Sequence, residues 1–258
     1  PRVDPLRVQP IPLGLDHITP HGDVPGQDIA RLMSQLENRP FVLVLGNDFQ
    51  HKNRDLALRV WEQVLEEGLN FDLVLAGLHV KSSSSREAEE ALLARHTNLR
   101  GKAHTLDHVS PGSRAWLLAH ASAVLYPSSA EGFGFVPYEA AALGTPSSFA
   151  LFGPLAELTG ISTAPRAWSV QAHVDDLRAL LTDPNAAKAR VDALRASSAD
   201  LTWDLFAQRL IEFVQRIDRL PPVEGALVGG TEGDAAALAS ILSSRTWRAT
   251  APLRRLGR

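Results

Sequence analysis

The sequence has no cysteine in its 258 residues, which excludes disulfide bonds, thiolate nucleophiles and thiolate metal ligands. It also lacks the Gly-Lys-Ser/Thr end of a phosphate-binding P-loop and the Gly-x-Ser-x-Gly turn of many hydrolases. No apolar run reaches the ~18 residues of a membrane-spanning helix, since stretches such as AWLLAHASAVLYP are interrupted by His120 and Ser122. The proline-rich start does not have the pattern of a secretion leader. We therefore expect no transmembrane segment, and a protein of the cytoplasm or of the inner membrane face.

An excess of charge of one sign is also missing. The chain has 26 Lys and Arg against 29 Asp and Glu, a formal net charge of -3. This balance gives no electrostatic reason to expect nucleic acid as a partner. The hydrophobic fraction of 45% and the charged fraction of 21% are those of an ordinary globular protein. The length fits one large domain with attached segments.

Composition divides the chain into three parts. Residues 1–26 are rich in proline and glycine and are interpreted as a linker that leads into the folded part. Residues 27–217 carry the regular hydrophobic patterns and are interpreted as one Rossmann-like domain. Residues 218–258 combine a Pro/Gly-rich linker with a basic tail.

Between residues 26 and 144, short apolar runs alternate with helical patterns. Such alternation predicts parallel βαβ units, so the expected fold class is α/β with a doubly wound parallel sheet. Ligands of such folds bind at the carboxyl ends of the strands, where loops lead into helix N-termini. Three further helices are expected at 168–184, 185–200 and 202–217. The expected strands are 41–46, 71–77, 99–104 and 123–128, and the earlier helices are 26–38, 51–68, 86–96, 111–121 and 135–144.

The most informative stretch is YPSSAEGFGFVPYEAAALGTP, residues 126–146. A strand ends at Pro127, a loop with two glycines follows, and a helix then begins. Glycines allow the backbone to approach a ligand closely, and the free amides and dipole of a helix N-terminus favour an anion. Glu131 and Glu139 lie on either side of this loop. Since carboxylates accept hydrogen bonds from vicinal hydroxyls, the pattern indicates a phosphate with sugars on both sides, as in a sugar nucleotide.

Each feature also has a plain structural interpretation. The loop alone could be a tight strand-to-helix turn, Glu131 a helix-capping acid and Glu139 a solvated helix position. Lys52 alone could be a surface cation beside a helix. The specificity lies in the joint pattern.

The stretch PSSAEGFGFVPYEAAALGTP resembles the signature of retaining glycosyltransferases of family 4, in which two glutamates are separated by seven residues around a Gly-Phe-Gly core. VLGNDFQHKNRDLALRVWEQV and FDLVLAG are similar to the first strand, basic loop and helix, and to the second strand, of these enzymes. PLAELTG and LTWDLFAQRLIEFVQRI are similar to a later turn and to the closing helix. The resemblance spans residues 8–217.

This resemblance implies the donor-binding, C-terminal half of a two-domain GT-B architecture, with the acceptor-binding N-terminal half missing from this chain. It implies a hexosyltransferase that moves a hexose from a nucleotide-diphosphate sugar to an acceptor glycan or lipid-linked glycan in bacterial polysaccharide or glycoconjugate synthesis. No metal or other obligatory cofactor is implied. The closing helix packs on the missing half in this family, so its apolar face is expected to be exposed.

The roles carry over by position. Glu131 would contact the hexose hydroxyls, Glu139 the ribose, and Lys52 the leaving diphosphate, where charge develops. The base would be recognised through the backbone around 102–109. The implied catalytic residues are Glu131 and Lys52, and the implied donor-binding residues are Gly46, Asn47, Lys52, Glu131, Gly132, Phe133, Gly134, Phe135 and Glu139.

One position departs from the family. The residue after Gly46 is usually basic, and here it is Asn47, which removes a charge-assisted contact worth about 1.5–3 kcal/mol. His51 is placed to compensate. The departure keeps a second hypothesis open, a catalytically weak or inactive nucleotide-sugar-binding or scaffold module. A sugar-nucleotide epimerase is a third, which the full signature disfavours.

The remaining polar candidates are interpreted as structural. No histidine is joined by acids at the spacing of metal ligands, and the adjacent acids of the later helical pattern are expected on a solvated face. These residues are His79, His104, His108, Asp107, Asp175 and Asp176.

Overall fold

The computed structural model describes residues 4–16, 26–96, 99, 101–166 and 168–221. The chain forms two compact units. The larger is Val8–Ile211, and the smaller combines Pro1–Arg7 with Glu212–Arg258. In the smaller unit the short 3-10 helix η1 (Pro5–Arg7) is joined to the other segment by a hydrogen bond from the Arg7 guanidinium to the Pro221 carbonyl. The basic tail predicted at 218–258 lies mostly outside the described residues.

The larger unit is built on a parallel sheet, which in the described residues has five strands in the order β3-β2-β1-β4-β5. In the central register Phe41 lies opposite Asp72, and Val42 lies opposite Ala123. This arrangement confirms the predicted α/β fold with a parallel sheet. The strands are β1 (Phe41–Leu45), β2 (Asp72–Ala76), β3 (Ala103–Leu106), β4 (Ala123–Tyr126) and β5 (Ser147–Phe149).

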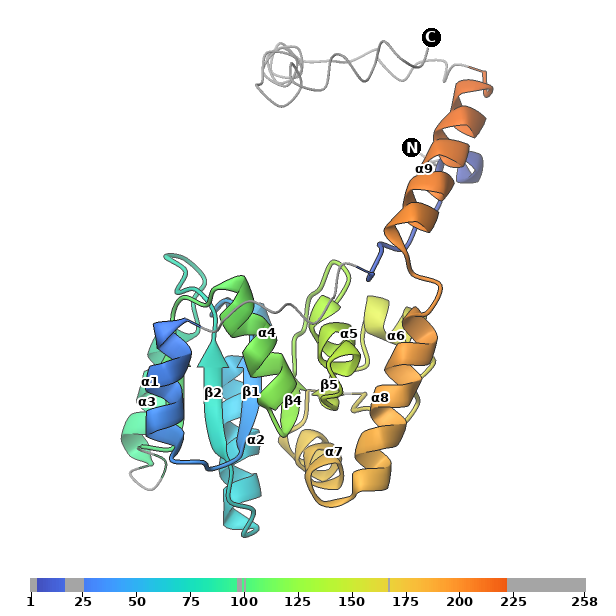
Figure 1. Ribbon diagram of the computed structural model, residues 1–258. Coiled ribbons are helices and arrows are strands. Elements are labelled where there is room, and N and C mark those ends of the chain that lie inside the picture. The colour runs from blue at the N-terminus through green and yellow to red at the C-terminus, as the bar shows by residue number, and fades with distance from the viewer. Residues whose placement is uncertain (1–3, 17–25, 97–98, 100, 167, 222–258) are drawn as a thin grey trace. The chain divides into compact units, whose positions relative to one another are not determined.

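Helices cover both faces of the sheet, as Figure 1 shows with α4 in front of the strands and α2 behind them. One apolar core joins the sheet to α1, α4, α5 and α8, and a second joins it to α2, α3 and α7. The bounds are α1 (Gln27–Leu36), α2 (Arg54–Glu66), α3 (Arg86–Arg95), α4 (Pro111–His120), α5 (Phe135–Ala142), α6 (Pro154–Leu158), α7 (Val170–Thr182), α8 (Pro184–Ser198) and α9 (Trp203–Asp218).

The continuous apolar run of β1 is explained by its two neighbours. All five residues of the strand are buried. Phe41 and Leu43 belong to one core and Val42 and Val44 to the other, because successive side chains of a strand point to opposite faces. A parallel strand covered on both faces therefore reads as a run of apolar residues and not as an alternation.

Two parts of the sheet differ from expectation. The strand predicted at 99–104 begins at Ala103, because Lys102 donates its amide to the Leu99 carbonyl and Gly101 takes a φ of +81°, which makes a turn first. β5 and α6 were not predicted at all. β5 has the sequence Ser-Ser-Phe, so no apolar run marks it although all three residues are buried.

The ends of the larger unit have their own features. Leu15, in the stretch interpreted as a linker, is buried, and its amide donates to the Leu201 carbonyl at 2.7 Å. On α9 no residue is buried, and Leu210, Ile211 and Val214 are 41%, 56% and 56% exposed. The expected exposed apolar face of the closing helix is therefore confirmed. No described helix is long and apolar enough to cross a membrane.

Candidate functional site

The loops that follow β1 and β2 come unusually close together at the carboxyl end of the sheet. Gly77 has a φ of +147°, and a Cβ there would lie 2.1 Å from the carbonyl oxygen of Gly46. A side chain at Gly77 would therefore push the two loops apart. Their approach forms one wall of a cavity of about 270 Å³.

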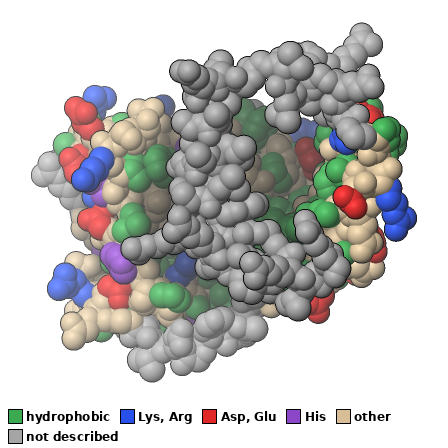
Figure 2. Space-filling model, turned by 90° about the horizontal axis from the view of Figure 1, so that it is seen from above, with side chains coloured by type: hydrophobic (Ala, Val, Ile, Leu, Met, Phe, Trp, Pro, Cys, Tyr) green, Lys and Arg blue, Asp and Glu red, His purple; other side chains and the backbone are tan. Residues whose placement is uncertain are grey.

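The ends of β1 and β2, the loops after β1, β2 and β3, and the helices α4 and α5 line this cavity, which opens where α/β folds bind ligands. Figure 2 views this end of the molecule from above, and its coloured side chains show acidic, basic and hydrophobic groups interspersed. His108 and Val109 come from the segment expected to recognise the base. The lining residues are Leu45, Gly46, Asn47, Lys52, Ala76, Gly77, Leu78, His108, Val109, Arg114 and Val136.

Lys52 is joined to the first glutamate of the motif. Its Nζ donates to Glu131 Oε1 at 2.6 Å, and the Tyr126 hydroxyl donates to the same oxygen at 2.5 Å. The ammonium also lies 5.3 Å from the centroid of the Tyr126 ring, within cation–π range. The Lys52 and Glu131 side chains are 19% and 15% exposed, so the pair is largely shielded but still open to the cavity side.

The position of Lys52 follows from how its loop is held. Lys52 ends the 3-10 helix η2 (Gln50–Lys52), and Asn53 follows with a φ of +51°. The Asn53 amide side chain donates to the Pro127 carbonyl at 2.8 Å, and the Ser129 backbone amide donates to the His51 carbonyl at 2.7 Å. The loop after β1 is thus joined to the loop after β4, which places Lys52 against Glu131.

This environment shifts the titration of both partners of Lys52. Burial by itself would raise the pKa of Glu131, but hydrogen bonds from Lys52, Ser128 and Tyr126 outweigh burial and lower the pKa. Burial and the neighbouring Glu131 carboxylate raise the pKa of Tyr126 far above its usual range. Glu131 is therefore an anion and Tyr126 a neutral hydrogen-bond donor at neutral pH.

The second glutamate of the motif, Glu139, lies on α5 and is only 5% exposed. Arg114 of α4 holds it with both ends of its guanidinium, Nη1 donating to Oε1 at 2.9 Å and Nη2 to Oε2. The Arg114 side chain remains 37% exposed and lines the cavity beside Lys52. Each glutamate is therefore paired with a cation that lines the same cavity, Glu131 with Lys52 and Glu139 with Arg114.

The glycine-rich loop between the glutamates leads directly into α5. Gly134 takes a φ of +84° at the N-cap, and a Cβ there would lie 2.9 Å from the Leu155 side chain, so the position requires glycine. No side chain makes a capping hydrogen bond at this helix end, where the helix dipole favours an anion. Phe133 is 7% exposed and packs against Phe135 and Tyr138, so only its backbone faces a ligand.

Behind the cavity, a charged network holds the loop that carries Asn47. Asn47 Oδ1 accepts from the Leu78 amide at 3.0 Å. The fully buried Asp48 accepts from the Val80 amide at 2.7 Å, from His79 at 2.7 Å and from Arg86 at 3.2 Å. Burial would raise the pKa of Asp48, but these hydrogen bonds lower it to about 2.

The structure thus brings together most of the residues predicted from sequence. Gly46, Asn47 and Lys52 line the cavity directly, and Glu131 and Glu139 contact residues that line it. Gly132 to Phe135 form the loop and helix start between the two acids. His51 instead stacks on Phe49 at 5.4 Å and does not line the cavity.

Sequence reasoning missed Tyr126, Arg114 and Asp48. Tyr126 could have been noticed as the polar end of a strand five residues before Glu131. Arg114 is 25 residues from Glu139, and nothing in the spacing shows that α4 and α5 lie side by side.

The structural interpretation of the other acids and histidines needs one correction. Asp175 is half-exposed and pairs with Arg178 at 2.6 Å, as a solvated face requires. Asp176 is not solvated, since it is 9% exposed and pairs with Arg190 at 2.7 Å. In the part of the chain that the structure describes, no cluster of His, Asp and Glu could hold a metal ion.

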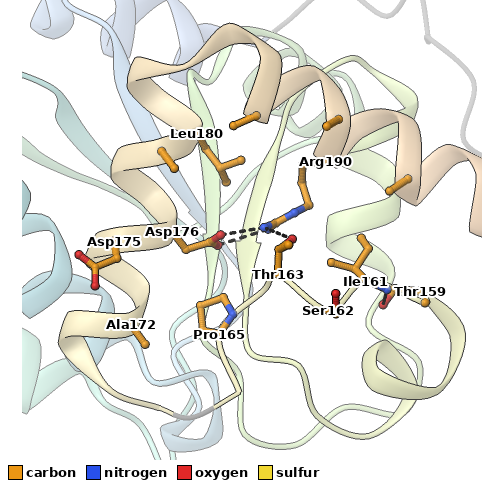
Figure 3. Close-up of a pocket in the computed structure, with 15 residues that line it drawn as sticks. Thr159, Ile161, Ser162, Thr163, Pro165, Ala172, Asp175, Asp176, Leu180 and Arg190 are labelled. Carbon is orange, nitrogen blue, oxygen red and sulfur yellow. Dashed lines mark hydrogen bonds and ion pairs between the residues drawn. The ribbon is translucent and has the colours of Figure 1, made fainter.

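Asp176 lies at a larger cavity of about 740 Å³ between α7, α8 and the 159–165 loop. Figure 3 shows Asp176, Arg190 and Thr163 joined to one another across its floor. Arg190 also donates to the Ser147 carbonyl at 2.7 Å, so this cavity lies at the β5 edge of the sheet. Asp176 and Arg190 are paired with each other, Asp175 is paired with Arg178, and the rest of the lining consists of small and apolar residues with alanine the most frequent. It is therefore the weaker candidate for a ligand site.

The fold and the cavity define an α/β protein with an anion-ready ligand site at the carboxyl end of its sheet. Comparison with known proteins assigns it more closely. The family described as Glycosyl transferases group 1 matches residues 28–196. The chain belongs to this family.

Individual relatives agree with the assignment. The glycogen synthase of Mycobacterium tuberculosis is 38% identical over 125 residues, which cover 43% of this chain and 30% of that protein. The D-inositol 3-phosphate glycosyltransferase of Xylanimonas cellulosilytica is 29% identical over 233 residues, covering 85% of this chain and 53% of that protein.

A solved structure shows the same fold. It is described as trehalose-6-phosphate from E. coli bound with UDP-2-fluoro glucose, has a TM-score of 0.69 and 12% identity, and the match covers 83% of this chain and 52% of that one. The match therefore spans about half or less of each of these proteins.

Proposed function

We propose that this chain is the donor-binding, C-terminal half of a retaining glycosyltransferase of family 4, which moves a hexose from a nucleotide-diphosphate sugar to an acceptor. The observation that carries the proposal is the pairing of both motif glutamates with cations that line one cavity, Glu131 with Lys52 and Glu139 with Arg114. The match covers only 53% of the inositol phosphate glycosyltransferase and 52% of the structural neighbour, which supports the proposal of a separate acceptor half.

Each side chain has a defined part in the proposed reaction. The bond between the anomeric carbon and the diphosphate oxygen breaks, so that negative charge develops on the diphosphate, while the acceptor hydroxyl oxygen forms a bond to the anomeric carbon and its proton passes to the departing diphosphate. Lys52 and the positive end of the α5 dipole stabilise that charge without a metal ion. Glu131 accepts hydrogen bonds from the hexose hydroxyls, and Glu139 accepts them from the ribose.

The UDP-2-fluoro glucose bound to the structural neighbour supports a nucleotide sugar as donor. A glycogen synthase and an inositol phosphate glycosyltransferase among the relatives support a carbohydrate or phosphorylated polyol as the acceptor class. We propose a cytoplasmic role in polysaccharide or glycoconjugate synthesis.

Titration calorimetry of the full chain against UDP-, GDP- and ADP-glucose tests the proposal. One of the three is expected to bind, and Glu139→Gln is expected to weaken that binding about 10–150-fold, the range of a lost hydrogen bond to a charged group. Glu66→Gln, at an exposed position on α2, is the matched control and should not change the affinity. Equal affinity of Glu139→Gln and the wild type would remove the ribose assignment.

A nucleotide-sugar-binding or scaffold module without activity is the second candidate. It is favoured by Asn47, whose side chain is neutral and already bonded to the Leu78 amide. Sugar transfer or donor hydrolysis by the parent protein that contains this chain would exclude it.

A further inference from the structure

Arg114 is a cation that the motif did not predict, and both of its outer nitrogens are used in holding Glu139. The two hydrogen bonds occupy both carboxylate oxygens, one at 2.9 Å and one shorter. A ribose hydroxyl that uses Glu139 as its acceptor therefore competes with Arg114 for these oxygens. The Arg114 side chain is 37% exposed and already lines the cavity, so its guanidinium borders the space that a ligand would enter.

A displaced Arg114 could bind the phosphate groups of a ligand in this cavity. Guanidinium keeps its charge at any accessible pH and offers a planar set of donors that matches phosphate oxygens. Gly46, Lys52 and the first turn of α5 at Val136 line the same cavity. A diphosphate that lies along Lys52 and the α5 N-terminus is therefore within the space that Arg114 borders.

The cavity also lacks a cation where one is expected. Asn47 is neutral, and its side-chain oxygen is bonded to the Leu78 amide. His51 stacks on Phe49 and is not part of the lining. Among the described residues that line the cavity, the Lys and Arg side chains are Lys52 and Arg114. Lys52 is already paired with Glu131.

We infer that Arg114 exchanges partners when the donor binds: the ribose takes the Glu139 oxygens, and the released guanidinium contacts the diphosphate. Without a donor, Glu139 thus keeps Arg114 beside the cavity. When the donor binds, Arg114 becomes the second phosphate-binding cation, which the neutral Asn47 does not provide. The inference rests on the proposed function, since it concerns the same donor.

Calorimetry of the full chain with nucleosides and their diphosphates separates the two contacts. The probes are UDP, GDP and ADP with uridine, guanosine and adenosine, and the variants are Arg114→Met and Arg114→Lys. For the base that binds, the ratio of nucleoside to diphosphate affinity should shift about tenfold or more toward the nucleoside in Arg114→Met. Arg114→Lys, which keeps the charge, should shift it less. An unchanged ratio in Arg114→Met overturns the inference.

A second measurement does not depend on the folding of the Arg114 variants. In Glu139→Gln the guanidinium no longer has a carboxylate partner, so inorganic pyrophosphate should bind this variant several-fold more tightly than it binds the wild type. Equal or weaker pyrophosphate binding overturns the inference. If the wild type binds no nucleoside diphosphate, the proposed function fails, whereas wild-type binding with an unchanged Arg114→Met ratio removes only the role of Arg114.

Discussion

Both ends of the sheet carry ion pairs, but the two ends differ in how far the carboxylate of the pair is buried. At the amino end, Asp72 begins β2 and is fully buried, with Arg39 Nε at 3.1 Å and His104 Nε2 at 2.7 Å from its carboxylate oxygens. At the carboxyl end, Lys52 and Arg114 pair with glutamates and also border a cavity. The Asp72 carboxylate is therefore closed to a ligand, although its partner Arg39 is 28% exposed, whereas Lys52 and Arg114 border the candidate site directly.

This difference indicates what each set of charges does. Breaking a fully buried pair is costly because it leaves an uncompensated charge in a low-dielectric interior. A pair that borders a cavity can exchange one partner for a ligand group of the same charge, so the exchange costs little. We therefore expect changes at the amino end to affect stability and changes at the carboxyl end to affect binding.

The largest effect is expected from Asp72→Ala. Removing this carboxylate leaves the buried His104 ring without its partner and removes the ion pair of the partly exposed Arg39, which should lower the free energy of unfolding by about 3 kcal/mol. Urea denaturation measures the change, and the folded protein should bind its nucleoside diphosphate as the wild type does. Asp175→Asn, at the exposed pair with Arg178, is the control and should change stability by less than about 1 kcal/mol. A loss of nucleotide affinity in Asp72→Ala, with stability unchanged, would reverse the assignment of the two ends.

The residues at the two ends of the sheet also differ in how far their roles could be predicted from the sequence. Glu131 and Glu139 are visible because one loop and one helix carry them both, and Lys52 is visible because its own loop has a recognisable pattern. Asp72 and His104 are 32 residues apart and meet only because β2 and β3 pair in a particular register. The same holds for Arg114 and Glu139, which depend on two helices lying side by side.

The same limit applies to the fold: strands marked by a local apolar run could be predicted, and a strand buried by distant helices could not. Long apolar runs such as those of β1 and β2 mark strands that are buried on both faces. β5 has two serines in three residues, and their burial depends on α7 and α8, which follow it in the chain. Local pattern cannot show that a polar tripeptide will be covered by helices formed later.

Asp48 is expected to affect both stability and binding, because its carboxylate is buried and it also holds the loop that carries Asn47. Its pKa falls from 3.8 to about 2 on folding, so the unfolded state binds more protons between these values. Its contribution, about 2 kcal/mol, is present above pH ~4 and is lost as the pH falls toward ~2. Asp48→Asn should therefore lower stability at pH 7 by about that amount and flatten the acid limb of the stability curve.

Stability of Asp48→Asn and wild type is compared by urea denaturation from pH 3 to 7. Because the Asp48 network also positions the Asn47 loop, nucleoside diphosphate affinity should fall as well. A constant stability difference across this range would show that the carboxylate charge is not what the network stabilises.

The smallest effect is expected on α9, whose apolar face belongs to neither end of the sheet. Ile211 and Val214 are each 56% exposed, so replacing either with serine removes little buried area and should change the free energy of unfolding by less than about 0.5 kcal/mol. Leu32→Ala on α1, where the side chain is fully buried, should cost about 2–5 kcal/mol in the same urea assay. A loss above about 1.5 kcal/mol in Ile211→Ser would mean that this chain itself covers the face in solution. A negligible loss leaves the face available to the proposed acceptor-binding half, because apolar side chains at helical spacing gain stability only when something packs against them.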